Sequence, residues 1–305
     1  MAGIKGSHCM SEKDNRPILE YYAQQSMITN PDKYAYLFND LPDDIPSLVK
    51  TVQGLLISLP WEEAYGLDTP QKRHNEIYLR TVPQMLERIL QLDSSPLIQE
   101  RSPEKRKVSL CRDFAVLLIS MLRHQGVPAR LRIGFAGFYR AETPKFWDHR
   151  IAEYWNERLS SWILVDAMTD NIQLKRLKFQ IDPLNINRNS PFLFAGDVWQ
   201  RCRAAKASPE EFGDSPDDLG MPPIRYALLH DFDALNKVEL VGFDTFHSLI
   251  NKPEHEVTED ERSLLDEIAE VTTRVDSRFD DLQTLYATTS YGQAVLNQLS
   301  SLHLI

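Results

Sequence analysis

Three residues of this 305-residue chain are of types that can do covalent chemistry together: Cys111, His149 and Asp166. A cysteine thiolate is a strong nucleophile, but it needs a basic partner to be reactive near neutral pH. An imidazole can act as that partner when a carboxylate orients its ring. The three residues occur in that order, 38 and 17 residues apart. The elements around them must therefore bring distant positions within hydrogen-bond reach.

The candidate nucleophile begins a predicted helix over 111–125. Apolar residues at helical spacing form one face of this segment, Gly126 suits the residue after a helix C-terminus, and Pro128 prevents continuation. Cys111 would therefore lie in the first turn, where unpaired backbone N–H groups and the helix dipole favour a thiolate.

Strands are predicted over 131–139, 149–155 and 162–166 from their apolar alternation and the turn residues between them. A short polar segment joins the last two, which predicts an antiparallel hairpin. Such a hairpin would bring His149, at the start of one strand, close to Asp166, at the end of the other.

Three stretches carry a longer pattern than these single residues. They are Cys111-Arg-Asp-Phe-Ala-Val-Leu-Leu-Ile-Ser-Met-Leu-Arg-His-Gln-Gly-Val-Pro-Ala-Arg130, His149-Arg-Ile-Ala-Glu-Tyr-Trp155 and Trp162-Ile-Leu-Val-Asp166. Together they resemble the transglutaminase-like superfamily of cysteine enzymes, which are papain-like in their use of Cys, His and Asp. The resemblance covers about residues 108–170 and is more specific for the fold than for the reaction.

The resemblance implies that Cys111 is the nucleophile, that His149 acts as base and later as acid, and that Asp166 orients His149. It implies attack on a carboxamide, an acyl-thioester intermediate, and transfer of the acyl group to an amine or to water. The expected partners are an amide- or peptide-containing substrate and an amine or water acceptor. No cofactor and no metal is expected.

The tetrahedral intermediate of such a reaction needs donors for its oxyanion. The backbone amide of Cys111 is one candidate donor, and Trp61 and Gln99 are candidates for the second donor, which the family places upstream of the cysteine. Asp148 is expected to be structural, because strand alternation points it away from the face that carries His149.

Other notable residues have structural explanations. We expect Arg130 to form an ion pair, with Asp113 as one candidate partner, and Cys202 to be structural, although its arginine neighbours leave a reactive thiol as the alternative. Three tryptophans could line an acyl cleft or pack in the core: Trp147, Trp155 and Trp162.

Two further functions stay open on the same residues. One is a peptide or amide hydrolase, protease-like or glycanase-like. A peptide:N-glycanase would usually add zinc-binding cysteines, and the three cysteines of this chain supply no such set. The other is a non-catalytic binding module on the same scaffold, which would usually lack the three reactive residues.

Composition excludes several classes of protein. The net charge of −10 argues against a nucleic-acid partner, and no apolar run is long enough for a membrane span. The three cysteines form no disulfide framework, and we recognise no export signal, so we expect a cytoplasmic protein. The sequence does not indicate an oligomeric state.

The fold class expected is α+β, with an antiparallel sheet against which the Cys111 helix packs. The predicted segments are an expression scar at 1–10, a helical lead-in at 11–107, a transglutaminase-like core at 108–200, a linker or loop at 201–223, and an acidic helical region at 224–305. Within the lead-in, an apolar stripe over 48–59 predicts a helix that has Pro46 in its first turn and that Pro60 ends.

Charge is distributed unevenly along the chain. Residues 101–158 carry 12 Lys/Arg and 6 Asp/Glu, whereas residues 206–281 carry 7 and 20. Solvated surface is the ordinary explanation. The alternatives are that the acidic segment packs on the basic one, or that the basic segment attracts anionic substrates.

Overall fold

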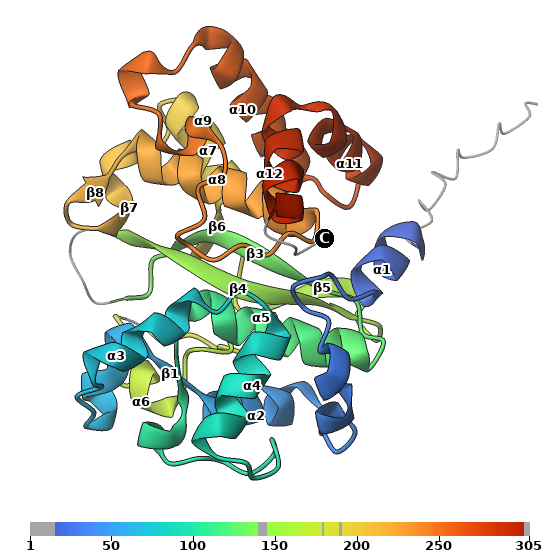
Figure 1. Cartoon of the computed structure of the whole chain (residues 1–305). Coiled ribbons are helices and arrows are strands. Elements are labelled where there is room, and N and C mark those ends of the chain that lie inside the picture. The colour runs from blue at the N-terminus through green and yellow to red at the C-terminus, as the bar shows by residue number, and fades with distance from the viewer. Residues whose placement is uncertain (1–15, 140–144, 179, 189–190, 302–305) are drawn as a thin grey trace, which may run out of the picture.

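A central sheet separates two groups of helices in the computed structural model of this chain (Figure 1). The structure describes residues 16–139, 145–178, 180–188 and 191–301, so the predicted expression scar at 1–10 lies outside the described residues. The strands are β1 (Leu56–Ser58), β2 (Lys107–Ser109), β3 (Ala129–Ala136), β4 (Phe146–Asn156), β5 (Ser161–Val165), β6 (Phe192–Phe194), β7 (Phe212–Ser215) and β8 (Asp218–Leu219).

The helices lie on both sides of that sheet. Those drawn below it in Figure 1 include α2 (Ile45–Leu55), α3 (Gln71–His74), α4 (Val82–Leu92), α5 (Cys111–His124) and α6 (Asn171–Leu174). Those above it are α7 (Ala195–Arg203), α8 (Met221–Leu235), α9 (Ser248–Asn251), α10 (Glu259–Thr273), α11 (Phe279–Thr288) and α12 (Ser290–Ser301), and α1 (Arg16–Ala23) lies at one end. This mixture of helices and a mainly antiparallel sheet confirms the α+β prediction.

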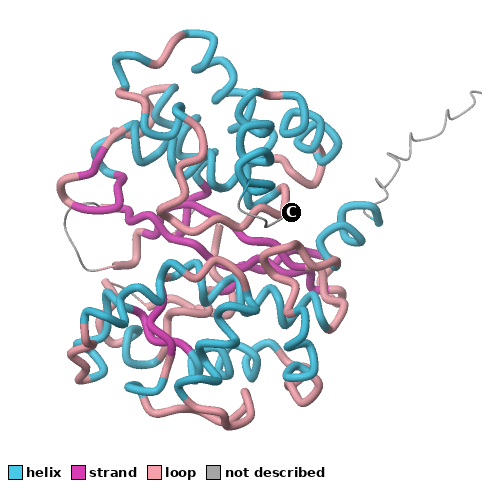
Figure 2. Tube along the Cα trace, viewed as in Figure 1, coloured by secondary structure: helices cyan, strands magenta, loops and turns pink. Residues whose placement is uncertain are grey.

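The main sheet has the strand order β6-β3-β4-β7-β8, with β5 paired to β4. Figure 2 shows these strands as one band, with the short β1–β2 pair apart from it. β4 and β5 are antiparallel, from Ala152 opposite Val165 to Asn156 opposite Ser161, so the predicted hairpin is confirmed. Because β5 ends at Val165, Asp166 is the first residue after it.

One edge of β4 is left open in the middle of the sheet. On that edge β7 pairs with Phe146 and Trp147, and β5 pairs only from Ala152 onward. Between them, from Asp148 to Ile151, β4 has pairing only with β3 on its other edge. A gap therefore forms in the sheet beside His149.

The helix α5 forms as the sequence predicts. It begins at Cys111 and ends at His124, one residue before the predicted end, and Gly126 takes a positive φ of 77° there. Every residue from Arg112 to Arg123 is buried. Leu110 precedes the helix and supplies no side-chain cap, so the first-turn amide groups beside the cysteine have no capping side chain.

The helix predicted to begin around Pro46 and to run to Pro60 starts as expected but ends earlier than predicted. α2 ends at Leu55, and β1 follows and pairs in parallel with β2, with Ser58 opposite Ser109. An apolar run does not by itself distinguish a helix from a buried strand, and the pairing with β2 decided between them. As a result, the segment before Pro60 is held beside the residues that precede Cys111.

The predicted linker at 201–223 also differs from the structure. It contains the end of α7, both β7 and β8, and the start of α8. Its Pro, Gly and acidic residues form the turns of a short hairpin that pairs with β4. Further on, Thr258 and Glu261 form a capping box at the start of α10, a pattern that is readable from the sequence alone.

One hydrophobic core spans the helices on both sides of the sheet. It includes Leu117 of α5, Leu131 of β3 and Phe232 of α8, all essentially inaccessible to solvent. No helix within the described ranges is long and apolar enough to cross a lipid bilayer.

Gly134 is required where β3 meets β6. A Cβ atom there would lie 2.1 Å from the carbonyl oxygen of Leu193. We therefore expect Gly134→Ala to lower the free energy of unfolding by about 1–3 kcal/mol or more, through overpacking. Gly54→Ala is the matched control: its nearest new contact is 3.2 Å, at Glu100, and alanine favours the helix. Urea titrations that gave both variants the same stability would contradict this account.

Candidate active site

The structure brings Cys111, His149 and Asp166 together. The imidazole Nε2 of His149 lies 3.0 Å from Oδ2 of Asp166, and both side chains are almost completely buried. The Cys111 side chain at the start of α5 is close enough to His149 to raise the pKa of the imidazole, and it is partly exposed. The three predicted residues thus form one connected group with the sulfur on its open side.

The electrostatics of this group favour charged forms. Burial alone would lower the pKa of His149, but the Asp166 carboxylate and the hydrogen bonds to Asp166 and Cys111 raise it to about 10. For Asp166, burial opposes ionisation, yet the charge and hydrogen bond of His149 hold the pKa of its carboxyl below the usual range. The pair is therefore an imidazolium and a carboxylate at neutral pH, and an adjacent imidazolium stabilises a thiolate.

The Asp166 carboxylate is held by its own loop. Oδ1 accepts from the backbone N–H groups of Met168 at 3.0 Å and Thr169 at 3.3 Å, and Oδ2 accepts from the Thr169 hydroxyl at 2.7 Å. These bonds leave the carboxylate one orientation, with an oxygen directed at His149.

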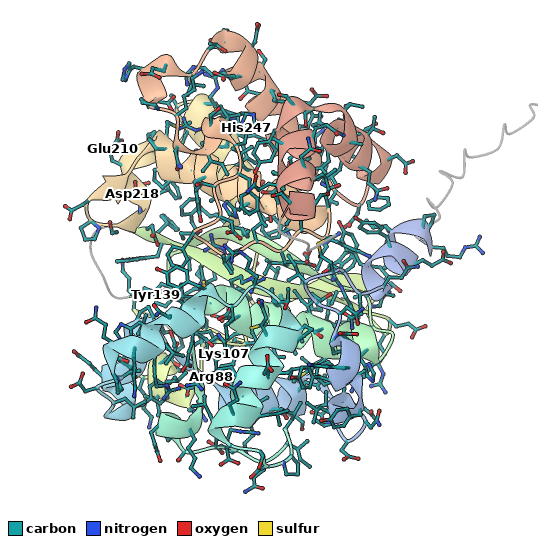
Figure 3. All side chains as sticks on the ribbon, in the orientation of Figure 1. Arg88, Lys107, Tyr139, Glu210, Asp218 and His247 are labelled. Atoms are coloured by element: carbon teal, nitrogen blue, oxygen red, sulfur yellow. The ribbon has the colours of Figure 1, made fainter. Side chains whose placement is uncertain are left out.

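Tyr139 is a site residue that the sequence analysis missed. Its hydroxyl lies 3.4 Å from each ring nitrogen of His149, and the two rings are nearly perpendicular (Tyr139 is labelled in Figure 3). Burial and the nearby charges of Asp166 and Cys111 raise the pKa of Tyr139 well above its usual value, so the phenol stays neutral. Its place at the end of the predicted strand 131–139, next to the strand that begins at His149, was the available signal.

A cavity of about 840 Å³ opens onto the sulfur. Its walls include Trp61, Tyr139, Trp147 and Phe243. Of the two candidate second donors, Trp61 lines this cavity and Gln99 is not among its lining residues.

Two polar residues beside His149, Asp148 and Arg150, also line the cavity, and only Asp148 was assigned a role from the sequence, a structural one. Asp148 pairs with Arg150 at 2.8 Å, and the guanidinium of Arg150 lies 3.3 Å from the hydroxyl of Tyr226. Asp148 and His149 are consecutive residues of β4, so their side chains leave opposite faces of the strand. Asp148 still reaches the cavity wall, which extends along the open edge of the strand.

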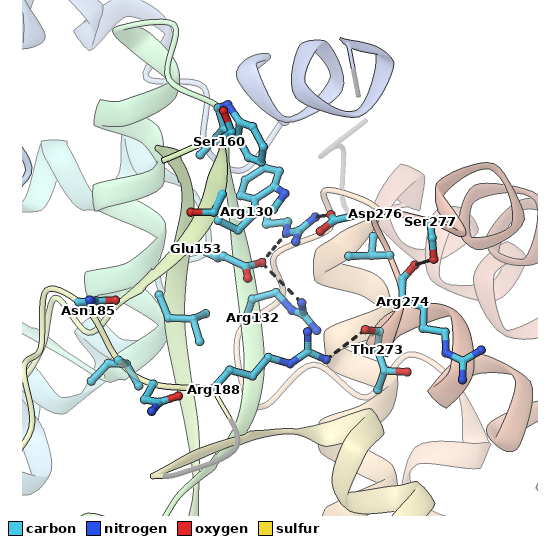
Figure 4. Close-up of a pocket in the computed structure, with 17 residues that line it drawn as sticks. Arg130, Arg132, Glu153, Ser160, Asn185, Arg188, Thr273, Arg274, Asp276 and Ser277 are labelled. Carbon is cyan, nitrogen blue, oxygen red and sulfur yellow. Dashed lines mark hydrogen bonds and ion pairs between the residues drawn. The ribbon is translucent and has the colours of Figure 1, made fainter. Parts of the chain in front are cut away.

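A second cavity, of about 820 Å³, lies away from the sulfur and is shown in Figure 4. Trp155 and Trp162 line it, so of the three tryptophans only Trp147 lines the Cys111 cavity. In this second cavity the guanidinium of Arg130 lies 3.9 Å from the ring centre of Trp162.

The predicted ion pair of Arg130 exists, but Asp113 is not its partner. Arg130 pairs with Glu153 at 2.5 Å, directly opposite it on β4, and with Asp276 at 2.8 Å. Asp113 instead pairs with the buried Lys107 at 2.7 Å. The strand register, which joins β3 to β4, determined this pairing.

The reactive-thiol alternative for Cys202 is wrong. Burial and the nearby carboxylates of Glu210 and Glu211 raise the pKa of this thiol to about 11. Among the residues that the structure describes, no group of His, Cys, Asp and Glu is arranged to hold a metal ion.

Comparison with known proteins assigns the segment that holds all three residues. Residues 98–167 match the family model of the transglutaminase-like superfamily. This segment is therefore similar to a transglutaminase-like domain. The match supports a cysteine enzyme in general, without deciding between transfer and hydrolysis.

Two other comparisons add little to this domain assignment. A crystal structure from Cytophaga hutchinsonii, described as a candidate cysteine protease, is 19% identical over 55% of this chain and 46% of that chain, with a TM-score of 0.29. The chain thus spans less than half the length of that protein, and a likeness this distant does not bear on the reaction. No curated protein matches the chain in sequence.

The ion pair predicts a pH dependence of stability. Because folding raises the pKa of His149, its protonated imidazole contributes to stability. This contribution is fully present below the unfolded pKa of about 6.5 and is lost as the pH rises through about 10. Folding lowers the pKa of Asp166, so its carboxylate contributes to the stability of the fold above the unfolded pKa of about 4. We expect His149→Gln to cost about 3 kcal/mol or more near pH 5.5, because it leaves a buried carboxylate without its partner.

That cost should shrink steadily between pH 6.5 and 10, as measured by urea unfolding at each pH. The exposed His255 supplies the control, because it is 82% exposed and His255→Gln should change little. A cost for His149→Gln that grew with pH in this range would contradict the ion pair.

The two described free cysteines predict a difference in reactivity. Cys111 should be alkylated by iodoacetamide at pH 7 at least about tenfold faster than Cys202, because only Cys111 has an imidazolium partner. Peptide mapping by mass spectrometry measures both rates in one sample. Equally slow labelling of the two thiols would rule out an activated nucleophile.

Proposed function

We propose that the transglutaminase-like domain is an enzyme that forms an acyl-thioester on Cys111 from an amide substrate and passes the acyl group to an amine or to water. One observation carries the proposal: a partly exposed thiol at a helix N-terminus contacts a buried imidazolium–carboxylate pair at the wall of a large cavity. Nucleophilic catalysis by cysteine needs this combination of thiolate, base and orienting group.

The first half-reaction releases the amine of the substrate. The Cys111 thiolate attacks the carbonyl carbon, so that a C–S bond forms and the carbonyl electron pair moves to oxygen. His149 then gives its proton to the amide nitrogen, the C–N bond breaks, and ammonia or an amine leaves. The ion pair with Asp166 keeps His149 oriented through this transfer.

The second half-reaction returns the enzyme to its starting state. An amine or a water molecule attacks the thioester carbonyl while His149 accepts its proton. The C–S bond then breaks, and the thiolate leaves with the electron pair of that bond. The new product is an amide when an amine attacks and a carboxylic acid when water attacks, and the cycle uses protein side chains alone.

The oxyanion formed in each half-reaction needs donors that face the cavity. We propose the backbone amide of Cys111 as one donor, because Leu110 leaves the helix start without a side-chain cap. We propose the indole N–H of Trp61 as the second, since Trp61 lines the same cavity. Loss of one such donor typically lowers kcat about 10²–10³-fold.

Hydroxylamine provides a test that does not depend on the natural acceptor. It attacks a thioester through nitrogen, forms a hydroxamic acid, and releases the thiolate. We expect hydroxamate formation from carboxamide-containing peptides or small amides with the intact chain. Cys111→Ser should reduce it by about 10³-fold or more, and Cys202→Ser should retain it.

Product analysis without hydroxylamine then separates the two reactions. A free carboxylic acid and ammonia indicate hydrolysis, and incorporation of a labelled primary amine indicates transfer. The enzyme proposal fails if no amide in a broad panel gives a hydroxamate or an acyl adduct on Cys111 by intact mass. The non-catalytic binding module is then the remaining function.

A further inference from the structure

Three carboxylates gather at one corner of the Cys111 cavity, where β4, β7 and β8 meet. They are Asp148, Asp214 and Asp218, which we call the acidic corner, and all three line the cavity. Asp218 is labelled in Figure 3, on the hairpin that projects beside the sheet. The predicted linker thus supplies two of the three carboxylates.

The strand register places these three carboxylates next to one another. β7 runs parallel to β4 with Gly213 opposite Trp147, so the next residues, Asp214 and Asp148, are neighbours on adjacent strands. Asp218 joins them from β8, where it is paired with Ser215 of β7. Like charges placed side by side on neighbouring strands are destabilising unless a positive charge compensates them.

Arg150 is the positive charge within this corner. It lies two residues after Asp148 on the same strand and contacts its Oδ2 at 2.8 Å. Burial and the charge of Asp148 raise the pKa of Asp214, although Arg150 opposes this effect. One guanidinium against three carboxylates leaves the corner with excess negative charge.

The other arginines of the cavity wall do not supply the missing charge. Arg112 is buried and donates to the backbone oxygens of Glu239 and Arg80 and to Asp113. Arg176, after α6, is exposed and also lines the cavity. Neither of them is among the groups that shift the Asp214 carboxyl.

Asp148 carries a second sign that a ligand group is missing. Its side chain is only 7% exposed, and Oδ1 has no hydrogen-bond partner among the described residues. A buried carboxylate oxygen without a donor is costly. The rings of Trp147, Tyr226 and Phe243 line the same cavity, and aromatic faces attract cations.

We infer that the acidic corner binds a positively charged group, an ammonium or a guanidinium, carried by the acyl donor. Asp148 is adjacent to His149 in the chain, so the charge would sit close to the carbonyl that Cys111 attacks. This inference rests on the proposed function and narrows its substrate class to cationic amides.

Charged methanethiosulfonate reagents test the inference without a known substrate. The thiolate attacks the reagent's sulfenyl sulfur, a disulfide forms, and methanesulfinate leaves with the electron pair of the broken S–S bond. The probes are the aminoethyl reagent (cationic), the sulfonatoethyl reagent (anionic) and the methyl reagent (neutral). Field focusing in a cleft predicts a cationic-to-anionic rate ratio at Cys111 on the order of 10 or more at low salt, falling as salt is added.

The exposed carboxylates allow a variant that should fold. Asp214 and Asp218 are exposed, so Asp214→Asn/Asp218→Asn should keep the native melting temperature and reduce the ratio at least about threefold at low ionic strength. Asp217→Asn is the matched control, because Asp217 lies in the same hairpin, is exposed, and is not among the cavity-lining residues. It should leave the ratio unchanged.

The neutral reagent separates this inference from the proposed function. If it labels Cys111 no faster than Cys202, the activated nucleophile fails, while the charge ratio is still measured. If Cys111 reacts fast but reacts no faster with the cationic reagent than with the anionic one, the cationic subsite fails alone. The inference is also overturned if Asp214→Asn/Asp218→Asn keeps the preference for the cationic reagent, or if the control Asp217→Asn lowers that preference to the same extent.

Discussion

The buried ion pair between His149 and Asp166 joins the two strands of the β4–β5 hairpin, and the site depends on it. β4 carries the imidazole, the residue after β5 carries the carboxylate, and the start of α5 brings the thiol. Removing one partner of a buried pair leaves an uncompensated charge, at a cost of about 3–5 kcal/mol. The hairpin register, the Thr169 loop and the α5 start must therefore all be in place for the thiol to have an imidazolium neighbour.

The C-terminal region contacts the core of the site-bearing sheet and helix through buried ion pairs. Arg132 pairs with Asp231 at 2.9 Å, and Arg123 pairs with Glu239 at 2.9 Å, with both pairs almost completely buried. In each pair the arginine comes from the basic stretch 101–158 and the carboxylate from the acidic stretch 206–281. Of the explanations for the uneven charge, packing of the acidic segment on the basic one therefore applies at these positions. The net charge of −10 describes the chain but not the local field at the site.

The open edge of β4 links the fold to the proposed chemistry. Between the part of β4 paired with β7 and the part paired with β5, Asp148, His149 and Arg150 all line the same cavity. A reactive group and a charged corner can thus share one cavity although their side chains alternate along one strand.

The sequence by itself determined the elements whose signals are local. The α5 boundaries, the β4–β5 hairpin and the Thr258 cap follow from residues within a few positions of one another, and the longer motif predicted that Cys111, His149 and Asp166 would meet. Only the tertiary structure decided the β1–β2 pair, the sheet role of β7 and β8, the partners of Arg130 and the position of Tyr139. Each of these depends on contacts between distant segments, whose energies depend on packing and register that no local pattern encodes.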